Sequence, residues 1–189
     1  MNIHDAIKTR RTIPLVSEQA VPADLIEKII EAGSYAPNHH KTEPWRFFVL
    51  QGDGRTKLGK VLREITSSQQ EDPLSESSIT KSERSERNPL RAPVVIAVGV
   101  EPSENDNVIM KEEYATVSSS VQNMLLTAHA LGLGAIWRTG AICYHPKVSD
   151  FFGLSTKGEI VAFIYLGYPE IEPKPYKRTD YKEFTTWIN

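Results

Sequence analysis

The chain has 189 residues, of which 40% are hydrophobic and 24% are charged, with a formal net charge of -2 and a pI of about 6.2. This composition is typical of one globular domain and argues against nucleic acid or an anionic membrane as the main partner. The single cysteine, Cys143, excludes an intrachain disulfide. Neither a signal-peptide core nor a membrane-length apolar run is present, so we expect a cytoplasmic protein.

The first third of the chain predicts helices and one strand. Apolar residues at helical spacing predict a short helix over residues 3–9. Pro22 suits a helix N1 position and precedes an amphipathic stripe, which predicts a helix over 22–33. The aromatic and branched segment 45–50 predicts a strand. A further helix is expected around 56–65.

The segment from Ser67 to Asn88 is rich in serine and charge and holds few large apolar residues. This composition is compatible with an exposed helix pair or with a mobile flap. A flap in this position is a candidate gate for an electron acceptor, and an ordinary surface excursion is the simpler interpretation.

The second half of the chain alternates strands with helices. We expect strands over 92–100, 133–137 and 159–168, a long helix over 110–131 and a short helix over 146–152. The long helix carries many small residues, which suit close packing against another helix or a second subunit. There is no regular βαβ alternation, so the pattern favours the α+β class over a doubly wound sheet.

The tail over residues 169–189 combines three prolines with four aromatic residues. We expect it to pack on a surface, such as that of a partner subunit. The remaining chain shows no convincing domain boundary, so residues 1–189 are expected to form a single domain.

Several common motifs are missing. Gly132-Leu133-Gly134 lacks the third glycine of a dinucleotide fingerprint and precedes a strand, so a Rossmann site is not expected. The sequence has no phosphate loop, no nucleophile elbow and no metal-binding HExxH pattern, and we expect no metal site. Cys143 with His145 is a conceivable thiol pair, although a small buried apolar role for the cysteine is favoured.

Three polar segments suggest a binding site, and each has an ordinary structural alternative. Arg10-Arg11-Thr12 matches a phosphate group, or forms a basic helix C-terminus. The polar loop between two prolines in Ala36–Trp45 suits recognition of a heterocycle edge, or simply connects a helix to a strand. In Gly132–Gly140, Trp137 offers a stacking face and Arg138 offers charge, unless the tryptophan fills the core.

Together and in this order, these segments resemble the nitroreductase family, and its small YdjA-like subgroup in particular. The family pattern is a helix ending R-R-S/T, an A-P…P-W-x-F block and a late G-x-G-x-x-W-R-[ST]-G block. The segment 163–169 also matches its closing strand and turn, so the resemblance covers nearly the whole chain. It implies a nitroreductase-like α-β sandwich, with a central, mostly antiparallel sheet flanked by helices. It also implies an intertwined homodimer with FMN at the interface.

The resemblance also implies site residues. The implied FMN contacts are Arg10, Arg11, Thr12, Tyr35, His39, Lys41, Trp137, Arg138 and Thr139. The implied NAD(P)H contacts are Ala128, His129, Ala130, Leu131, Gly132 and Leu133. Lys41 stands where the family usually has a flavin-reading asparagine, and Lys177 and Arg178 are further candidates for the phosphate. No side chain is expected to be an essential catalytic acid.

The implied activity is that of an FMN-dependent oxidoreductase. It would take hydride from NAD(P)H and reduce a small electron-poor acceptor, nitroaromatic or quinone-like, by a ping-pong mechanism. The alternative is a flavin-binding protein without this turnover, either a carrier or a flavin-consuming enzyme. An interaction module that lost the cofactor, and more remotely a hydrolase, are further alternatives.

Overall fold

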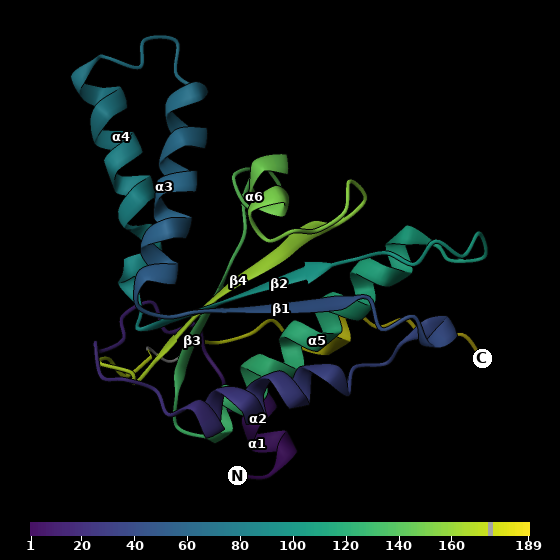
Figure 1. Cartoon of the computed structure of the whole chain (residues 1–189). Coiled ribbons are helices and arrows are strands. Elements are labelled where there is room, and N and C mark those ends of the chain that lie inside the picture. Colours follow the sequence, from purple (N-terminus) through teal and green to yellow (C-terminus); the bar gives the residue numbers. More distant parts are fainter. Residues whose placement is uncertain (174–175) are drawn as a thin grey trace.

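One antiparallel sheet forms the centre of the molecule, in a computed structural model that describes residues 1–173 and 176–189. The strands lie in the order β1-β2-β4-β3 (Figure 1). They are β1 (Trp45–Leu50), β2 (Val94–Val100), β3 (Gly134–Arg138) and β4 (Glu159–Gly167). These are the strands that the sequence predicted, each within a residue or two, and their antiparallel pairing confirms the α+β class.

Helices cover both faces of the sheet (Figure 1). On one face lie α2 (Ala23–Ser34) and α5 (Met110–Ala130), with α1 (Ile3–Thr9) beside α5. On the other lie α3 (Asp53–Ser68) and α6 (Pro146–Phe151), and α4 (Glu76–Arg87) packs on α3. Three 3-10 turns complete the described elements: η1 (His39–Lys41), η2 (Asn88–Arg91) and η3 (Tyr181–Phe184). None of the described helices is both long and apolar enough to span a membrane.

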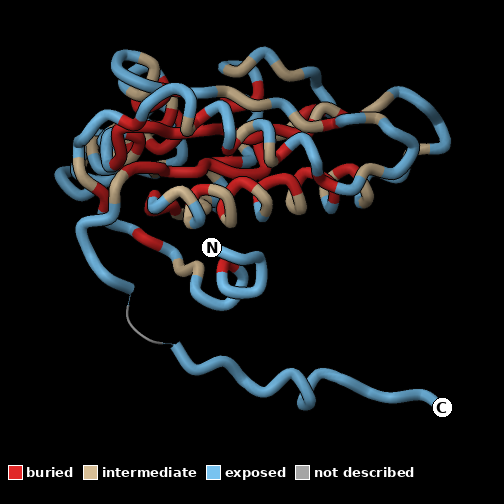
Figure 2. Tube along the Cα trace, turned by 90° about the horizontal axis from the view of Figure 1, so that it is seen from below, coloured by how far each residue is buried: buried red, intermediate tan, exposed pale blue. Residues whose placement is uncertain are grey.

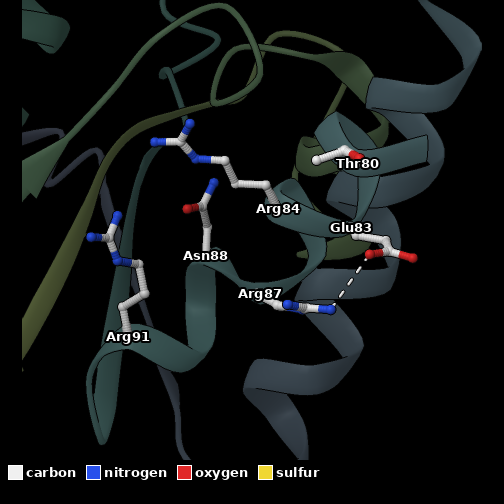
Figure 3. Close-up of a pocket in the computed structure, with 6 residues that line it drawn as sticks. All are labelled: Thr80, Glu83, Arg84, Arg87, Asn88 and Arg91. Atoms are coloured by element: carbon white, nitrogen blue, oxygen red, sulfur yellow. Dashed lines mark hydrogen bonds and ion pairs between the residues drawn. The ribbon is translucent and has the colours of Figure 1, made fainter. Parts of the chain in front are cut away.

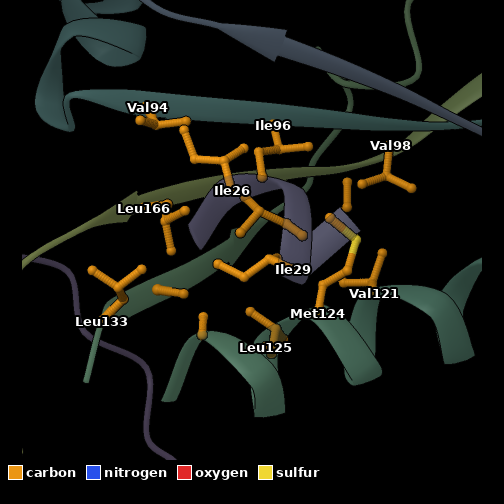
Figure 4. Packing of buried hydrophobic residues seen from close by; sticks show 14 of the residues in the cluster. Ile26, Ile29, Val94, Ile96, Val98, Val121, Met124, Leu125, Leu133 and Leu166 are labelled. Atoms are coloured by element: carbon orange, nitrogen blue, oxygen red, sulfur yellow. The ribbon is translucent and has the colours of Figure 1, made fainter. Parts of the chain in front are cut away.

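Strand β2 shows why the sheet needs helices on both sides. Its alternate residues Val94, Ile96 and Val98 enter the core under α2 and α5 (Figure 4). Val95 and Ala97 enter the second core, under α3 and α6. Side chains of a strand point alternately to its two faces, so a strand buried on both faces is apolar throughout. The continuous apolar run in the sequence therefore reflects a central strand.

Helices α2 and α5 pack closely. Ile29 is fully buried between them and the sheet (Figure 4), which stabilises the fold by roughly 2–3 kcal/mol for a side chain of this size. At Gly33 an added Cβ would lie 2.9 Å from the Ser120 hydroxyl, closer than real Cβ contacts. A glycine and a serine at this crossing let the two backbones approach each other. Ser120, one of the small residues of the long helix, thus contacts α2 within the same chain.

Residues 67–88 adopt the helix pair that was one of the two expectations for them. Helix α3 runs to Ser68, a few residues beyond the predicted end, and α4 begins after Ser75. The Ser75 hydroxyl accepts a hydrogen bond from the Ser78 backbone N–H, a typical N-cap. This α3–α4 hairpin projects from one end of the sheet (Figure 1).

The tail leaves the rest of the chain. Apart from Arg178, which lies near Arg10, residues 176–189 extend away from it (Figure 2), and the Trp187 side chain is 83% exposed. Lys174 and Pro175, which belong to the proline-rich stretch, lie outside the described residues. Within one copy of the chain, the aromatic side chains of this tail therefore have no surface to pack on, as far as the described residues show.

Candidate functional site

The arginine pair follows α1 in an extended segment beside the open edge of β3. Arg10 caps the helix with φ -54° and ψ 130°, which ends the helical turn. The Ile13 N–H then donates to the Ala135 carbonyl at 3.0 Å, and Val16 forms a bridge with Pro169. These contacts fix Arg10, Arg11 and the following threonine next to the edge strand.

A basic cavity of about 580 Å³ lies at this position. Arg10, Arg11, Thr12 and Arg178 line it, together with Glu172 and two apolar neighbours. Burial lowers the pKa of Arg10, and repulsion from Arg178 and then Arg11 lowers it further. Guanidinium groups remain charged in proteins. The cavity therefore gathers like charges, and this arrangement suits an anion.

No ion pair within 4 Å joins these arginines to a carboxylate among the residues that the structure describes. Arg11 instead donates from Nη1 to the Lys8 carbonyl at 2.7 Å and to the Arg10 carbonyl at 2.9 Å. The helix-terminus alternative thus holds in part for Arg11. Arg10 and Arg178 have no carboxylate partner within 4 Å among the described residues, so both can bind an anion. A phosphate fits this donor set, because a guanidinium fork binds it with two parallel hydrogen bonds.

The last residues of β3 lie on opposite faces of the sheet. Trp137 packs against the core under α2 and α5 and donates from Nε1 to the Val161 carbonyl at 3.3 Å. Arg138 lies over the Tyr165 ring, 5.1 Å from its centroid, on the other face. The Nε of Arg138 is buried without a hydrogen-bond partner among the described residues. Thr139 is exposed just beyond the strand.

The segment Ala128–Leu133 closes α5 and turns into β3. Ala128 and Leu133 are buried in the core, whereas Ala130 and Gly132 are exposed. His129 lies 2.8 Å from the Thr9 hydroxyl through Nε2. Burial and the two neighbouring arginines lower the pKa of His129. The cavity between this segment and the arginine pair is only about 10 Å³, so the segment packs directly against the two arginines.

Among the remaining expected contacts, Tyr35 follows the end of α2, where Asn123 of α5 donates to the Ala32 carbonyl at 3.2 Å, and the other two lie near the start of α5. Tyr35 caps α2 and is 77% exposed, and His39 and Lys41 form the turn η1. The loop contacts α5 through a hydrogen bond of 2.6 Å from the Thr42 hydroxyl to Glu113. At about 1.5 Å per residue, α5 places Glu113 about 24 Å from His129. One copy of the chain therefore does not bring this loop to the basic cavity.

The loop around η1 is strained. His40, Lys41 and Glu43 have φ values of 57°, 55° and 48°, a left-handed conformation that disfavours residues with a Cβ. The Asn38 side chain spans the loop, donating to the Thr42 hydroxyl at 3.1 Å and accepting from the Glu43 N–H at 3.0 Å. The residues expected to read the flavin are thus held in one conformation.

Glu113 anchors this loop, and the sequence interpretation missed it. Its side chain is 1% exposed. Besides the bond from Thr42, it accepts a hydrogen bond of 3.3 Å from the Ser103 backbone N–H. A signal was present: a glutamate lies at helical spacing from Val117 and Val121 on the apolar face of the long helix. A carboxylate in such a position needs partners, and this one finds them in a loop.

Two further expectations from the sequence concern Cys143 and a metal site. Cys143 is buried, and burial raises the pKa of its thiol to about 12, with Glu159 adding to the effect. This agrees with the favoured structural role. Within residues 1–173 and 176–189, no group of three or more His, Cys, Asp or Glu side chains is placed to hold a metal ion.

Comparisons with known proteins agree with the motif order. The sequence model described as the Nitroreductase family matches residues 7–168. YdjA of Escherichia coli, provisionally named an NAD(P)H nitroreductase, is 33% identical over 172 residues, 91% of each chain. YfhC of Bacillus subtilis, with the same provisional name, is 31% identical over 182 residues, covering 96% of this chain and 91% of the relative.

Solved structures match the fold along its whole length. A nitroreductase-like family protein from Bacillus cereus has a TM-score of 0.84 and 28% identity, covering 100% of this chain and 96% of the other. A provisionally named nitroreductase from Desulfovibrio desulfuricans, crystallised in complex with FMN, has a TM-score of 0.73 and 26% identity, covering 100% and 98%. The expected nitroreductase-like α-β sandwich is thereby confirmed. The chain belongs to the Nitroreductase family.

Proposed function

We propose that this protein is an FMN-dependent oxidoreductase that takes hydride from NAD(P)H and reduces a small electron-poor acceptor, such as a nitroaromatic compound or a quinone. The observation that carries the proposal is the basic cavity of Arg10, Arg11, Thr12 and Arg178 beside β3. Membership of the Nitroreductase family, the names of the relatives and the FMN complex of a structural neighbour support it.

The cavity suits the phosphate end of FMN. Arg10 and Arg178 would bind the phosphate through their guanidinium groups, and the Thr12 hydroxyl would complete the contact. Arg11 divides its donors between the helix end and the cavity. Each hydrogen bond to a charged group contributes roughly 1.5–3 kcal/mol. The mutual repulsion of the arginines would be relieved by a dianion.

The ring end of the site would lie at the end of β3. The proposed contacts there are Arg138, Thr139 and the backbone of Trp137, because the Trp137 ring packs against the core. When bound, FMN supplies the redox chemistry, and one stacking position over its ring can serve NAD(P)H and the acceptor in turn. Such a ping-pong scheme needs no separate dinucleotide fold and no protein nucleophile. The segment Ala128–Leu133 remains our proposed NAD(P)H contact, through its exposed backbone and His129.

We further propose that the site is completed by a second copy of the chain. His39 and Lys41 lie about 24 Å along α5 from the cavity, so a two-fold partner is the simplest way to bring them, with Tyr35, to that site. Two exposed apolar surfaces support a homodimer. They are formed by Ile3 and Ile7 on α1, 59% and 53% exposed, and by the aromatic tail. The tail would then pack on the partner subunit, and Lys41 would carry positive charge to the ring.

An absorbance experiment tests the proposed activity. The purified protein, supplied with FMN, should show a flavin spectrum that NADH or NADPH bleaches without oxygen and that a nitroaromatic or quinone restores. A flavin spectrum that neither nicotinamide bleaches would favour the carrier or the flavin-consuming enzyme. A protein that stays colourless with added FMN would favour an interaction module. Either result would contradict the proposal.

A substitution tests the phosphate contact. Arg10→Ala should weaken FMN binding at least tenfold, because about 1.4 kcal/mol corresponds to a factor of ten. Arg63→Ala is a matched control, since Arg63 is an exposed arginine on α3 that pairs with Glu86. FMN fluorescence quenching gives both dissociation constants. Equal affinity of Arg10→Ala and the parent protein would show that the phosphate binds elsewhere.

A further inference from the structure

Helix α4 has two faces with different roles. Its buried face consists of Ser78, Ser82 and Ser85, which pack on α3. The Thr66 hydroxyl donates to the Ser85 hydroxyl at 2.8 Å, and a Cβ at Gly59 would collide with the Glu86 carbonyl. The hairpin is therefore held together by small residues in close contact. The other face of α4 is not needed for this packing.

That other face, with η2, forms an arginine groove. A cavity of about 330 Å³ is lined by Thr80, Glu83, Arg84, Arg87, Asn88 and Arg91 (Figure 3). Arg84, Asn88 and Arg91 are four and three residues apart, so they follow each other at about one helical turn. Figure 3 shows their side chains extending to the same side, while Arg87 turns toward Glu83. The groove thus presents two guanidinium groups with an amide between them.

Two nearby carboxylates are already engaged, while Glu76 lines the adjoining cavity at the far end of the groove. Glu83 pairs with Arg87 at 3.4 Å, and Glu86 pairs with Arg63 of α3 at 2.7 Å. Neither Arg84 nor Arg91 forms an ion pair within 4 Å in the described part of the chain. Arg84 also lines an adjoining cavity of about 520 Å³ that continues the groove along α4. Positive charge in the groove is therefore left for a ligand.

At its η2 end, the groove leads into β2, which pairs with the strand that carries Tyr165. Burial raises the pKa of Tyr165 to about 12, while the positive charges of Arg138 and then Arg91 oppose this rise. The backbone agrees: Arg91 ends η2 three residues before β2 begins, and Val95 of β2 pairs with Tyr165, over whose ring Arg138 lies 5.1 Å from the centroid. An anionic group held by the α4–η2 arginines would belong to a molecule that approaches the ring site from the hairpin side.

We propose that the arginine groove is a binding site for a phosphate group, held by Arg84 and Arg91 with the Asn88 amide as a neutral donor. Two planar guanidinium forks match the oxygens of a phosphate dianion better than those of a smaller or singly charged anion. The phosphate can be inorganic phosphate or the 2′-phosphate of NADPH. The second source alone rests on the proposed function, and it would give the enzyme a preference for NADPH over NADH.

Calorimetric titration with inorganic phosphate tests the site, on protein with and without bound FMN, which would occupy the basic cavity beside β3 under the proposed function. Arg84→Ala and Arg91→Ala should each weaken phosphate binding about tenfold. Arg63→Ala, the paired arginine of the same hairpin, should bind phosphate like the parent. The proposal is overturned if the parent does not bind phosphate, or if the two groove variants bind it as well as Arg63→Ala does.

Nicotinamide specificity then distinguishes the two sources. If NADPH is the ligand, kcat/KM for NADPH over that for NADH should exceed one in the parent and fall about tenfold in Arg84→Ala and Arg91→Ala. If this ratio is unchanged while phosphate binding is lost, the site serves free phosphate. Failure of both nicotinamides to reduce the flavin of the parent protein would contradict the proposed oxidoreductase, and the phosphate titration would still decide the groove.

Discussion

Glu113 provides the sharpest test of how the loop around η1 is held. The loop holds three residues in a left-handed conformation, each costing roughly 1–2 kcal/mol. Glu113 offsets this cost through its two hydrogen bonds, from the Thr42 hydroxyl at 2.6 Å and the Ser103 N–H at 3.3 Å. Bonds to a charged group contribute roughly 1.5–3 kcal/mol each. The conformational cost of the three left-handed residues and the stabilisation from the two Glu113 hydrogen bonds are therefore of similar magnitude.

Replacing the carboxylate should release the loop. We expect Glu113→Ala to lower the free energy of unfolding by about 3 kcal/mol, since some of the lost bonding is recovered when the loop relaxes. With an m-value of about 2 kcal/mol/M, the urea midpoint would fall by about 1.5 M. The affinity for FMN should also fall about tenfold, because His39 and Lys41 would lose their fixed positions.

Two control variants separate the hydrogen bonds from other effects. Glu113→Gln keeps the shape and one acceptor, so it should lose about half as much stability as Glu113→Ala. Glu112→Ala removes the neighbouring, partly exposed glutamate and should shift the urea midpoint by no more than about 0.3 M, since most surface changes stay within about 0.5 kcal/mol. If Glu113→Ala shifts the midpoint no more than Glu112→Ala, Glu113 does not anchor the loop. Unchanged FMN affinity of Glu113→Ala would show that the loop does not contribute to FMN binding.

Three further predictions concern other parts of the fold. Gly59→Ala should destabilise the α3–α4 hairpin by about 1–3 kcal/mol in urea unfolding, because its Cβ meets the Glu86 carbonyl, whereas Gly54→Ala in the same helix should be neutral or stabilising. The lowered pKa of His129 means that its protonation opposes folding. The protein should therefore be more stable above pH 6.5, the ordinary pKa of histidine, and should lose stability as the pH falls below 6.5. An NMR titration should show that FMN raises the pKa of His129. An NMR value at or above 6.5 without FMN would refute this. Cys143, with a thiol pKa of about 12, should resist iodoacetamide at pH 8 until urea unfolds the chain, and rapid alkylation of the native protein would contradict its burial.

The sequence by itself determined the elements of this protein and the family. Apolar periodicity located β2 and α5, because a central strand and a buried helix face are dictated by which residues must avoid water. The order of three short polar segments identified the Nitroreductase family, since each segment has to sit at a particular turn of the fold. The Arg10–Thr12 segment alone matched a phosphate contact or a basic helix C-terminus, and only the family resemblance favoured the phosphate.

Tertiary structure alone decided how these residues meet. It placed Arg178, which the sequence offered only as one of two candidates, in the cavity with Arg10. It joined Glu113 to a loop 71 positions away in the chain, a pairing that no local pattern encodes. It also separated His39 from the cavity by most of the length of α5, because a helix is a rigid rod with a fixed rise per residue. Contacts between distant segments depend on how the helices pack on the sheet. A local sequence pattern describes each helix or strand separately and carries no information on that packing.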